Sequence, residues 1–224
     1  WMYKTNFSLD ANILKKKNIV LEFEGLDTYA KIYINGNYQL DTDNAFRKHR
    51  ISLKDIPHSK NNELKIIFYP TKSNEESTKE NLGYQLPEGN RIFTRKAQFQ
   101  YGWDWGPKLN ISGIWKPIKL IAWDEFKSEE VYIRNQSISK EKAVLKSTIT
   151  VSNSSNRIAS LAIKNNDNLL VKFLKLKKGT HTYKLPFTIH NPKLWWPHNL
   201  GKPHLYDLKF QIVSDENIQD KKSI

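Results

Sequence analysis

The chain has 224 residues, 38% of them hydrophobic and 12% aromatic, so it can bury a core in one large or two modest domains and is not a disordered segment. Its formal net charge of +13 is spread over both halves of the chain, and many lysines alternate with apolar residues, which argues against a nucleic-acid partner. The absence of cysteine excludes disulfides and thiolate metal sites, and no apolar run approaches the ~20 residues of a membrane-spanning helix.

The first half of the chain alternates apolar and polar residues, a pattern typical of strands with one buried face. The expected strands are residues 19–23, 29–34, 46–53, 64–69 and 118–122, with a further strand that starts near residues 37–40. Asn35-Gly36 directly follows the second of these and predicts a type I′ hairpin turn, because both positions of that turn take a positive φ. Residues 71–90 are polar and are expected to form a long loop that contains at most one short helical turn.

The second half repeats this pattern at closer spacing, after a polar stretch at 124–130 that is a candidate domain boundary. The expected strands are residues 131–134, 143–151, 158–163, 169–176, 180–189 and 205–213. Short strands at regular spacing are typical of an immunoglobulin-like sandwich. No long apolar period of 3.6 residues occurs, so few helices are expected.

Three groups of segments, read together, resemble one family. They are residues 23–28, 33–36 and 43–47; residues 95–107 and 112–117; and residues 192–197 with 201–206. With Trp103-Asp104-Trp105-Gly106-Pro107 at its centre, the sequence resembles the β-mannosidases of glycoside hydrolase family 2 over nearly the whole chain. Sister enzymes, namely β-galactosidases, β-glucuronidases and exo-β-glucosaminidases, share the Gly-Ile-Trp and Trp-Pro elements in looser form and remain alternatives.

The resemblance implies an all-β chain with two domains: a jelly-roll sugar-binding β-sandwich at 1–123, lacking its first strands, and an immunoglobulin-like β-sandwich at 124–224. Members of the family continue into a (β/α)8 barrel that carries the catalytic carboxylates, and that barrel is absent from this sequence. We therefore expect an inactive fragment, cut at both ends, of a retaining exo-acting enzyme. Its expected partners are that barrel and a β-mannoside-type carbohydrate, without nucleic acid, membrane or cofactor. Of the possible compartments we favour a periplasmic or secreted one.

Asp104 is the main candidate site residue, because the matching aspartate of the family holds sugar hydroxyls in the barrel's active site. The alternative is that Asp104 caps a turn by accepting backbone N–H groups. Trp103 and Trp105 are candidate substrate contacts as well, with burial in the sandwich core as the alternative. Arg95, Lys96 and Gln98 are interpreted as polar positions of a strand, with a role in shaping the inter-domain face as the alternative.

No catalytic pair and no metal site is expected. The six histidines lack metal-ligand spacing. Of the neighbouring acids, one pair is placed on the wet side of a strand and the rest in turns and loops: Glu22 and Glu24, then Asp41 and Asp43, Glu75 and Glu76, Glu129 and Glu130. Trp195 and Trp196 are interpreted as a cover for the second domain rather than a sugar platform.

Two other hypotheses stay open. The chain could be a free-standing carbohydrate-binding module, or a structural domain whose aromatic face docks on another domain. Residues 99–115 discriminate between them: an exposed aromatic stripe with an accessible Asp104 favours sugar contact, and a buried stripe favours the structural domain.

Overall fold

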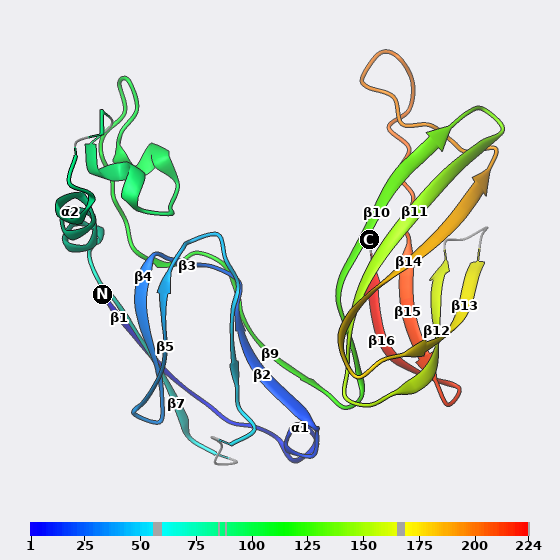
Figure 1. Cartoon of the computed structure of the whole chain (residues 1–224), viewed down its shortest axis with the longest axis horizontal. Coiled ribbons are helices and arrows are strands. Elements are labelled where there is room, and N and C mark those ends of the chain that lie inside the picture. Colours follow the sequence, from blue (N-terminus) through cyan, green and yellow to red (C-terminus); the bar gives the residue numbers. More distant parts are fainter. Residues whose placement is uncertain (56–59, 85, 88, 165–168, 224) are drawn as a thin grey trace. The chain divides into compact units, whose positions relative to one another are not determined.

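The computed structural model describes residues 1–55, 60–84, 86–87, 89–164 and 169–223. The polypeptide divides into two compact units, Trp1–Ala122 and Trp123–Ile224 (Figure 1). Strands hold 54% of the residues and helices 12%, so the all-β class predicted from the alternating pattern is confirmed.

Unit 1 is a β-sandwich of antiparallel strands. One sheet has the order β1-β7-β4-β5, with bounds Met2–Phe7, Asn62–Phe68, Tyr29–Ile34 and Asn37–Asp43. The other has the order β6-β2-β9, with bounds His49–Ser52, Asn18–Phe23 and Ile118–Trp123, and the short strands β3 (Leu26–Asp27) and β8 (Gly113–Ile114) pair beside it. The strand expected at 46–53 is therefore shorter than predicted, and β1 was not predicted.

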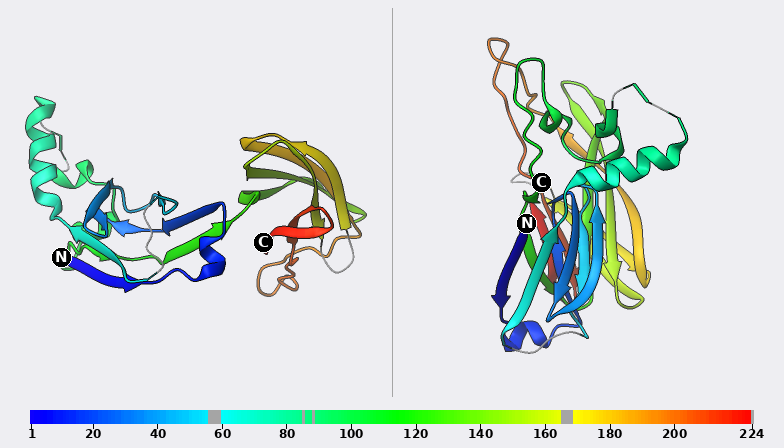
Figure 2. Two further views of the ribbon diagram at one scale, coloured as in Figure 1. Left: turned by 90° about the horizontal axis from the view of Figure 1, so that it is seen from below. Right: turned by 90° about the vertical axis from the view of Figure 1, so that its left-hand side faces the viewer.

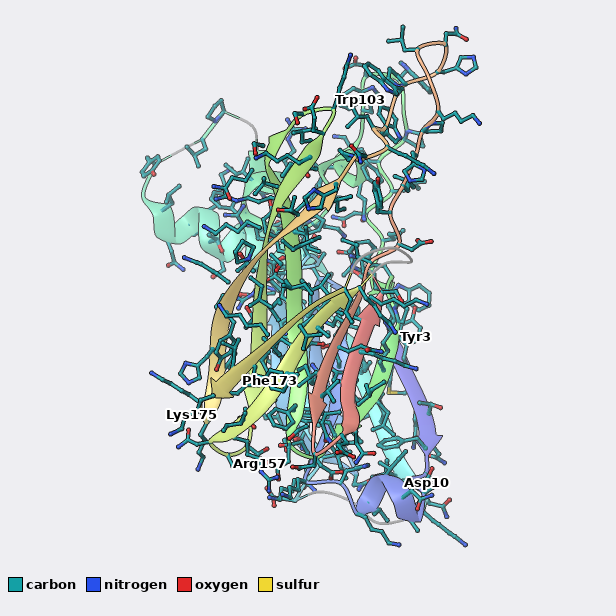
Figure 3. All side chains as sticks on the ribbon, turned by 90° about the vertical axis from the view of Figure 1, so that its right-hand side faces the viewer. Tyr3, Asp10, Trp103, Arg157, Phe173 and Lys175 are labelled. Atoms are coloured by element: carbon teal, nitrogen blue, oxygen red, sulfur yellow. The ribbon has the colours of Figure 1, made fainter. Side chains whose placement is uncertain are left out.

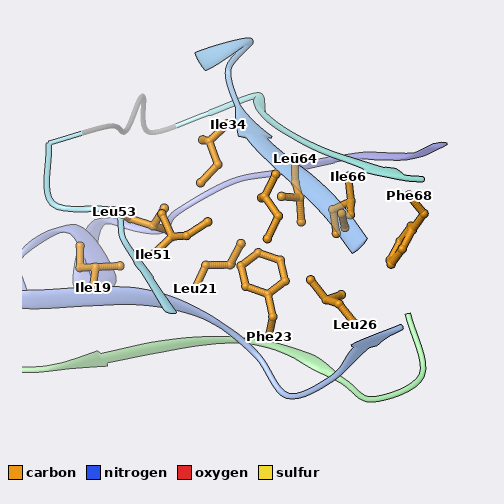
Figure 4. Close-up of a cluster of buried hydrophobic side chains, with 12 residues drawn as sticks. Ile19, Leu21, Phe23, Leu26, Ile34, Ile51, Leu53, Leu64, Ile66 and Phe68 are labelled. Atoms are coloured by element: carbon orange, nitrogen blue, oxygen red, sulfur yellow. The ribbon is translucent and has the colours of Figure 1, made fainter. Parts of the chain in front are cut away.

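The core of unit 1 lies between these sheets, where alternate side chains of each strand meet (Figure 4). In β7 every second residue is buried, which is the period of a strand with one face against the core. Phe23 of β2 and Ile32 of β4 are completely buried. Asn35 and Gly36 have φ values of 51° and 79°, so the predicted hairpin turn between β4 and β5 is confirmed.

The expected long loop at 71–90 is wrong, because Thr71–Leu82 forms the helix α2. Its sequence gave no apolar period, since its only buried residues are Thr71 and Glu75. Pro70 precedes its first residue, and Gly83 ends it with a φ of 74°, the left-handed conformation common at helix ends. Figure 2 shows that α2 extends beyond the end of the sheets. The other helical pieces are α1 (Ala11–Leu14), η1 (Gly89–Phe93) and η2 (Gln98–Tyr101).

Unit 2 is a second β-sandwich. One sheet has the order β10-β11-β14, with bounds Phe126–Ile138, Lys142–Asn153 and Gly179–His190. The other has the order β13-β12-β15-β16, with bounds Leu169–Leu176, Arg157–Lys164, Lys209–Ser214 and Asn217–Ser223. Strand β10 begins inside the polar stretch at 124–130, the strand expected at 205–213 begins only at Lys209, and β16 was not predicted.

Both sheets of unit 2 contribute to its core. The cluster contains Phe126 of β10, Ile149 of β11, Leu161 of β12 and Phe210 of β15. The last three of these side chains have no exposed surface. Strands β11 and β15 alternate between buried and less buried residues, so the period-2 pattern identifies their core face, whereas β12 is buried continuously from residue 159 to 163.

The edge strand β13 has an unusual outer face. Leu169, Val171 and Phe173 are exposed there and lie at alternate positions of the strand. Lys175 follows at the next alternate position of this row, and Lys172 lies on the opposite face of the strand; Figure 3 shows Phe173 and Lys175 on this strand.

Candidate functional site

The candidate site residues Trp103, Asp104 and Trp105 lie in a tight turn of unit 1. The Gly106 N–H donates to the Trp103 carbonyl oxygen at 3.3 Å, which places Asp104 and Trp105 at the two central positions. This turn lies at the end of unit 1 that also holds α2, opposite the end that holds Asp10 (Figures 1 and 3).

All three side chains face solvent. Trp103 is 69% exposed and Trp105 is 90% exposed, so the alternative of burial in the sandwich core is wrong for both. The Asp104 carboxylate is exposed and accepts no hydrogen bond from any residue that the structure describes, so turn capping does not occupy it. An accessible carboxylate between two exposed indoles can accept hydrogen bonds from hydroxyl groups while a ring packs against C–H groups.

Further apolar side chains around the turn are also exposed: Phe99, Leu109, Ile111 and, partly, Trp115. An exposed aromatic stripe over residues 99–115 is the feature expected to favour a role in sugar contact over a purely structural role. In unit 1 the side chains of this stripe are exposed. A group of exposed apolar side chains of this kind marks a site of binding or docking.

Gly102 precedes the turn, at a position where only a residue without a side chain fits. Its φ of +105° is a conformation that other residues rarely adopt, and a Cβ there would lie 2.9 Å from Lys108 Cγ. The aliphatic part of the Lys108 side chain therefore packs directly on the backbone of Gly102. This contact joins the two sides of the segment that carries Asp104.

Lys96 lies beneath this segment with a completely buried side chain. Its Nζ donates to Asn110 Oδ1 and to the Ile111 carbonyl oxygen, both at 2.6 Å, and lies 3.4 Å from Asp27 Oδ1. Burial lowers the pKa of Lys96 below its ordinary value, and the nearby Asp27 carboxylate opposes that shift. The interpretation of Lys96 as a polar strand position is therefore wrong.

A second buried carboxylate, Glu75 of α2, holds the other side of the segment. Its Oε1 accepts hydrogen bonds from Thr94 Oγ1 at 2.8 Å and from the Tyr101 hydroxyl. Burial raises the pKa of Tyr101, and the hydrogen bond to Glu75 raises it further. Asn110 Nδ2 also donates to Thr71 Oγ1 at 3.0 Å, so α2 is joined to the segment at both of its buried residues.

Trp115 brings the other family-like segments of unit 1 together. Its Nε1 donates to the Ala45 carbonyl oxygen at 2.9 Å, and its ring meets Phe46 edge-on at 6.4 Å between centroids. The indole lies so close to Gly25 that a Cβ there would be 2.5 Å from Nε1. Ala45 N–H in turn donates to the Arg95 carbonyl oxygen at 2.8 Å, which links this cluster to the start of the candidate segment.

Most of the acids that are paired in the sequence form ion pairs or hydrogen bonds. Glu22 is not on a wet face as expected: its side chain is buried, and its Oε2 lies 2.6 Å from Arg50 Nη2. Glu24 pairs with Lys119 at 2.8 Å, and that hydrogen bond lowers the pKa of Glu24. The other pairs lie in regular elements rather than loops, since they fall within β5, α2 and β10.

No group of His, Cys, Asp and Glu side chains among the described residues could hold a metal ion. Over the same part of the chain, every helix is too short or too polar to cross a membrane.

In unit 2, Trp195 and Trp196 keep about half of their surface exposed, and neither is among the side chains packed against the two core clusters of that unit, so their role as a cover stays a prediction. Trp196 N–H donates to the Lys202 carbonyl oxygen at 3.1 Å, and a Cβ at Gly201 would lie 2.7 Å from the Trp196 ring. The segment is thus a small folded loop with two exposed indoles.

Comparison with protein families gives matches over both units. Residues 1–116 match the family described as "Glycosyl hydrolase 2 galactose-binding domain-like", and residues 128–223 match "Glycosyl hydrolases family 2". Among curated proteins, the chain is 28% identical to β-mannosidase B of Thermothelomyces thermophilus, over 100% of this chain and 26% of that protein. The chain therefore spans about a quarter of the length of the curated relatives it matches.

Among solved structures, the chain is similar to the β-D-mannosidase of Dictyoglomus thermophilum, with a TM-score of 0.91 and 32% identity, over 100% of this chain and 29% of that one. A putative β-galactosidase of Bacteroides fragilis gives a TM-score of 0.70 at 18% identity, over 100% of this chain and 32% of that one. The β-glucuronidase of Bacteroides uniformis gives 0.69 at 18% identity, over 99% and 25%. The last two show a shared fold alone.

Proposed function

Because this chain belongs to glycosyl hydrolase family 2, we propose that it is the non-catalytic N-terminal part of a retaining, exo-acting β-mannosidase. In this proposal residues 1–123 are the jelly-roll sugar-binding domain and residues 124–224 the immunoglobulin-like domain. The catalytic (β/α)8 barrel belongs to the rest of the enzyme, and it supplies the two carboxylates, about 5 Å apart, that retaining hydrolysis needs.

The exposed turn at Trp103, Asp104 and Trp105 carries this proposal. Asp104 accepts hydrogen bonds from the hydroxyl groups of the terminal sugar, since a carboxylate accepts but does not donate. Trp103 and Trp105 form walls that exclude water and pack on the apolar face of the sugar ring. The exposed side chains of Phe99 and Leu109 lie against the barrel in the whole enzyme.

A mannoside is favoured over other sugars by the comparisons. Identity to the solved β-D-mannosidase is 32% with a TM-score of 0.91, whereas the putative β-galactosidase and the β-glucuronidase reach 18% and about 0.7. The same exposed turn also fits a free-standing carbohydrate-binding module. That alternative predicts measurable affinity of this chain alone for manno-oligosaccharides.

The decisive substitution is Asp104→Asn in the longer enzyme, which removes the charge and keeps the shape. We expect kcat/KM for p-nitrophenyl β-mannoside to fall roughly 10- to 150-fold, because a hydrogen bond to a charged group contributes about 1.5–3 kcal/mol. Asp55→Asn, at another exposed aspartate, is the matched control and should leave kcat/KM unchanged. Equal kinetics for both variants would refute the role of Asp104.

The 224-residue chain gives a second test. At an intact mass of 26.3 kDa it should release no p-nitrophenol from the β-mannoside. Turnover at that mass would overturn the assignment of the catalytic carboxylates to the barrel, and saturable binding without turnover would favour the free-standing module.

A further inference from the structure

The segment that carries Asp104 has little apolar packing to hold it. Phe99, Trp103, Leu109 and Ile111 all face solvent. Apolar side chains that remain in water contribute little to fixing a backbone, because the stabilisation comes from the area removed from water. The segment's position must therefore depend on its polar contacts.

Lys96 makes the most central of these contacts. It precedes the segment, and its Nζ bonds Asn110 Oδ1 and the Ile111 carbonyl oxygen at the segment's far end, both at 2.6 Å. One ammonium group therefore closes a loop of 14 residues, measured from Lys96 to Asn110. Fixing the two ends together removes much of the loop's conformational freedom.

The ammonium is anchored to the sheet as well. It pairs with Asp27 of β3 at 3.4 Å, and the other oxygen of that carboxylate accepts from Gln100 Nε2 at 2.9 Å. Asp27 thus contacts both Lys96, at the start of the loop, and Gln100 of η2. A buried charge without partners would be costly, so this arrangement is strongly specified in the folded state.

We propose that Lys96 is a positioning residue for the sugar-contact turn: through Asp27, Asn110 and Ile111 it sets the place of Asp104 without touching the sugar. The inference rests on the proposed function of Asp104. It extends that function to a buried cation that has no direct part in recognition.

Asn110 offers the sharpest test, because Lys96 needs only its acceptor oxygen while Thr71 needs its donor. Thr71→Val removes only the bond from Asn110 Nδ2 and leaves Oδ1 to accept from Lys96, whereas Asn110→Leu removes both bonds. We expect hydrogen exchange of the amides at 102–106 and 108–109 to rise about tenfold in Asn110→Leu and to stay near the wild-type rate in Thr71→Val. Equal exchange in the two variants would overturn the role of Lys96, because loss of its bond to Asn110 would then add nothing.

Lys96→Met tests the same contact from the other side, with Lys54→Met at an exposed position as its control. We expect faster exchange at 102–109 with unchanged exchange in β4 and β7, and a fall of tenfold or more in kcat/KM of the longer enzyme. If Lys96→Met does not fold, the comparison of Asn110→Leu with Thr71→Val decides alone.

Kinetics separate the two proposals. If Asp104→Asn lowers kcat/KM but Asn110→Leu loosens the segment without any kinetic effect, the positioning role of Lys96 is wrong and the role of Asp104 stands. If Asp104→Asn itself has no effect, the proposed function fails, whatever the exchange rates show.

Discussion

Replacing Gly25 by alanine tests how the family-like segments of unit 1 are joined. The added Cβ would lie 2.5 Å from Trp115 Nε1 and 2.8 Å from Cε2, which is closer than such atoms can approach. The φ of Gly25 is not in the left-handed region, so alanine fits the backbone there and the contact with the indole is the whole problem. Because Trp115 is half exposed, its ring can move away.

The cost follows from what the ring leaves behind. It loses the hydrogen bond to the Ala45 carbonyl oxygen, worth about 1 kcal/mol. It also loses the edge-on contact with Phe46, worth about 0.5–1.5 kcal/mol. We therefore expect Gly25→Ala to lower the free energy of unfolding of unit 1 by about 2 kcal/mol. For a unit of this size, that loss corresponds to a fall in Tm of roughly 5–10 °C.

Calorimetry of the 224-residue chain would measure this Tm, with the transition of unit 2 as the internal reference. A double-mutant cycle with Trp115→Ala isolates the contact. In the Trp115→Ala background, Gly25→Ala should change the free energy of unfolding by less than about 0.5 kcal/mol, since the clash is gone. The same large loss in both backgrounds would refute the reasoning.

Three further predictions concern stability. Burial, with a smaller contribution from the positive charge of Arg47, lowers the pKa of His49 below its ordinary value of 6.5, so the unfolded chain binds this proton more tightly. Unit 1 should lose stability as the pH falls below 6.5, and His49→Gln should flatten that part of its urea-midpoint profile; an unchanged slope would contradict this. Asp220→Asn weakens two 2.6 Å hydrogen bonds from Ser128 and should lower the Tm of unit 2 by a few degrees in calorimetry. An unchanged Tm would argue against a role for the carboxylate. Phe126→Ala should cost unit 2 about 3–5 kcal/mol by urea unfolding, and a loss under about 1 kcal/mol would show that the site collapses without a cavity.

Much of the fold follows from local sequence, because a strand with one buried face repeats every two residues. The alternation located most strands of both units, and Asn35-Gly36 located a hairpin turn. The helix α2 escaped prediction for a physical reason: it buries Thr71 and Glu75 rather than an apolar stripe, and its partners Thr94, Tyr101 and Asn110 follow it by roughly 20 to 40 residues.

The candidate site, too, could be predicted from the sequence only in part. Asp104 and its flanking tryptophans could be named from the sequence because the motif is compact and unusual in composition. Lys96 could not be identified in this way, because a lysine is usually a surface residue and its partner Asp27 lies 69 positions earlier in the chain. Glu22 was misplaced for the same reason, since its partner Arg50 lies on a neighbouring strand.

The outer face of strand β13 has a consequence for handling the protein in concentrated solution. A strand at the edge of a sheet can pair with the same strand of another molecule, and an apolar row such as Leu169, Val171 and Phe173 would favour that pairing. Lys172 and Lys175 place positive charge along the same strand, so two copies repel each other as they approach. High salt screens that repulsion, and association of this chain should therefore become more pronounced as ionic strength rises.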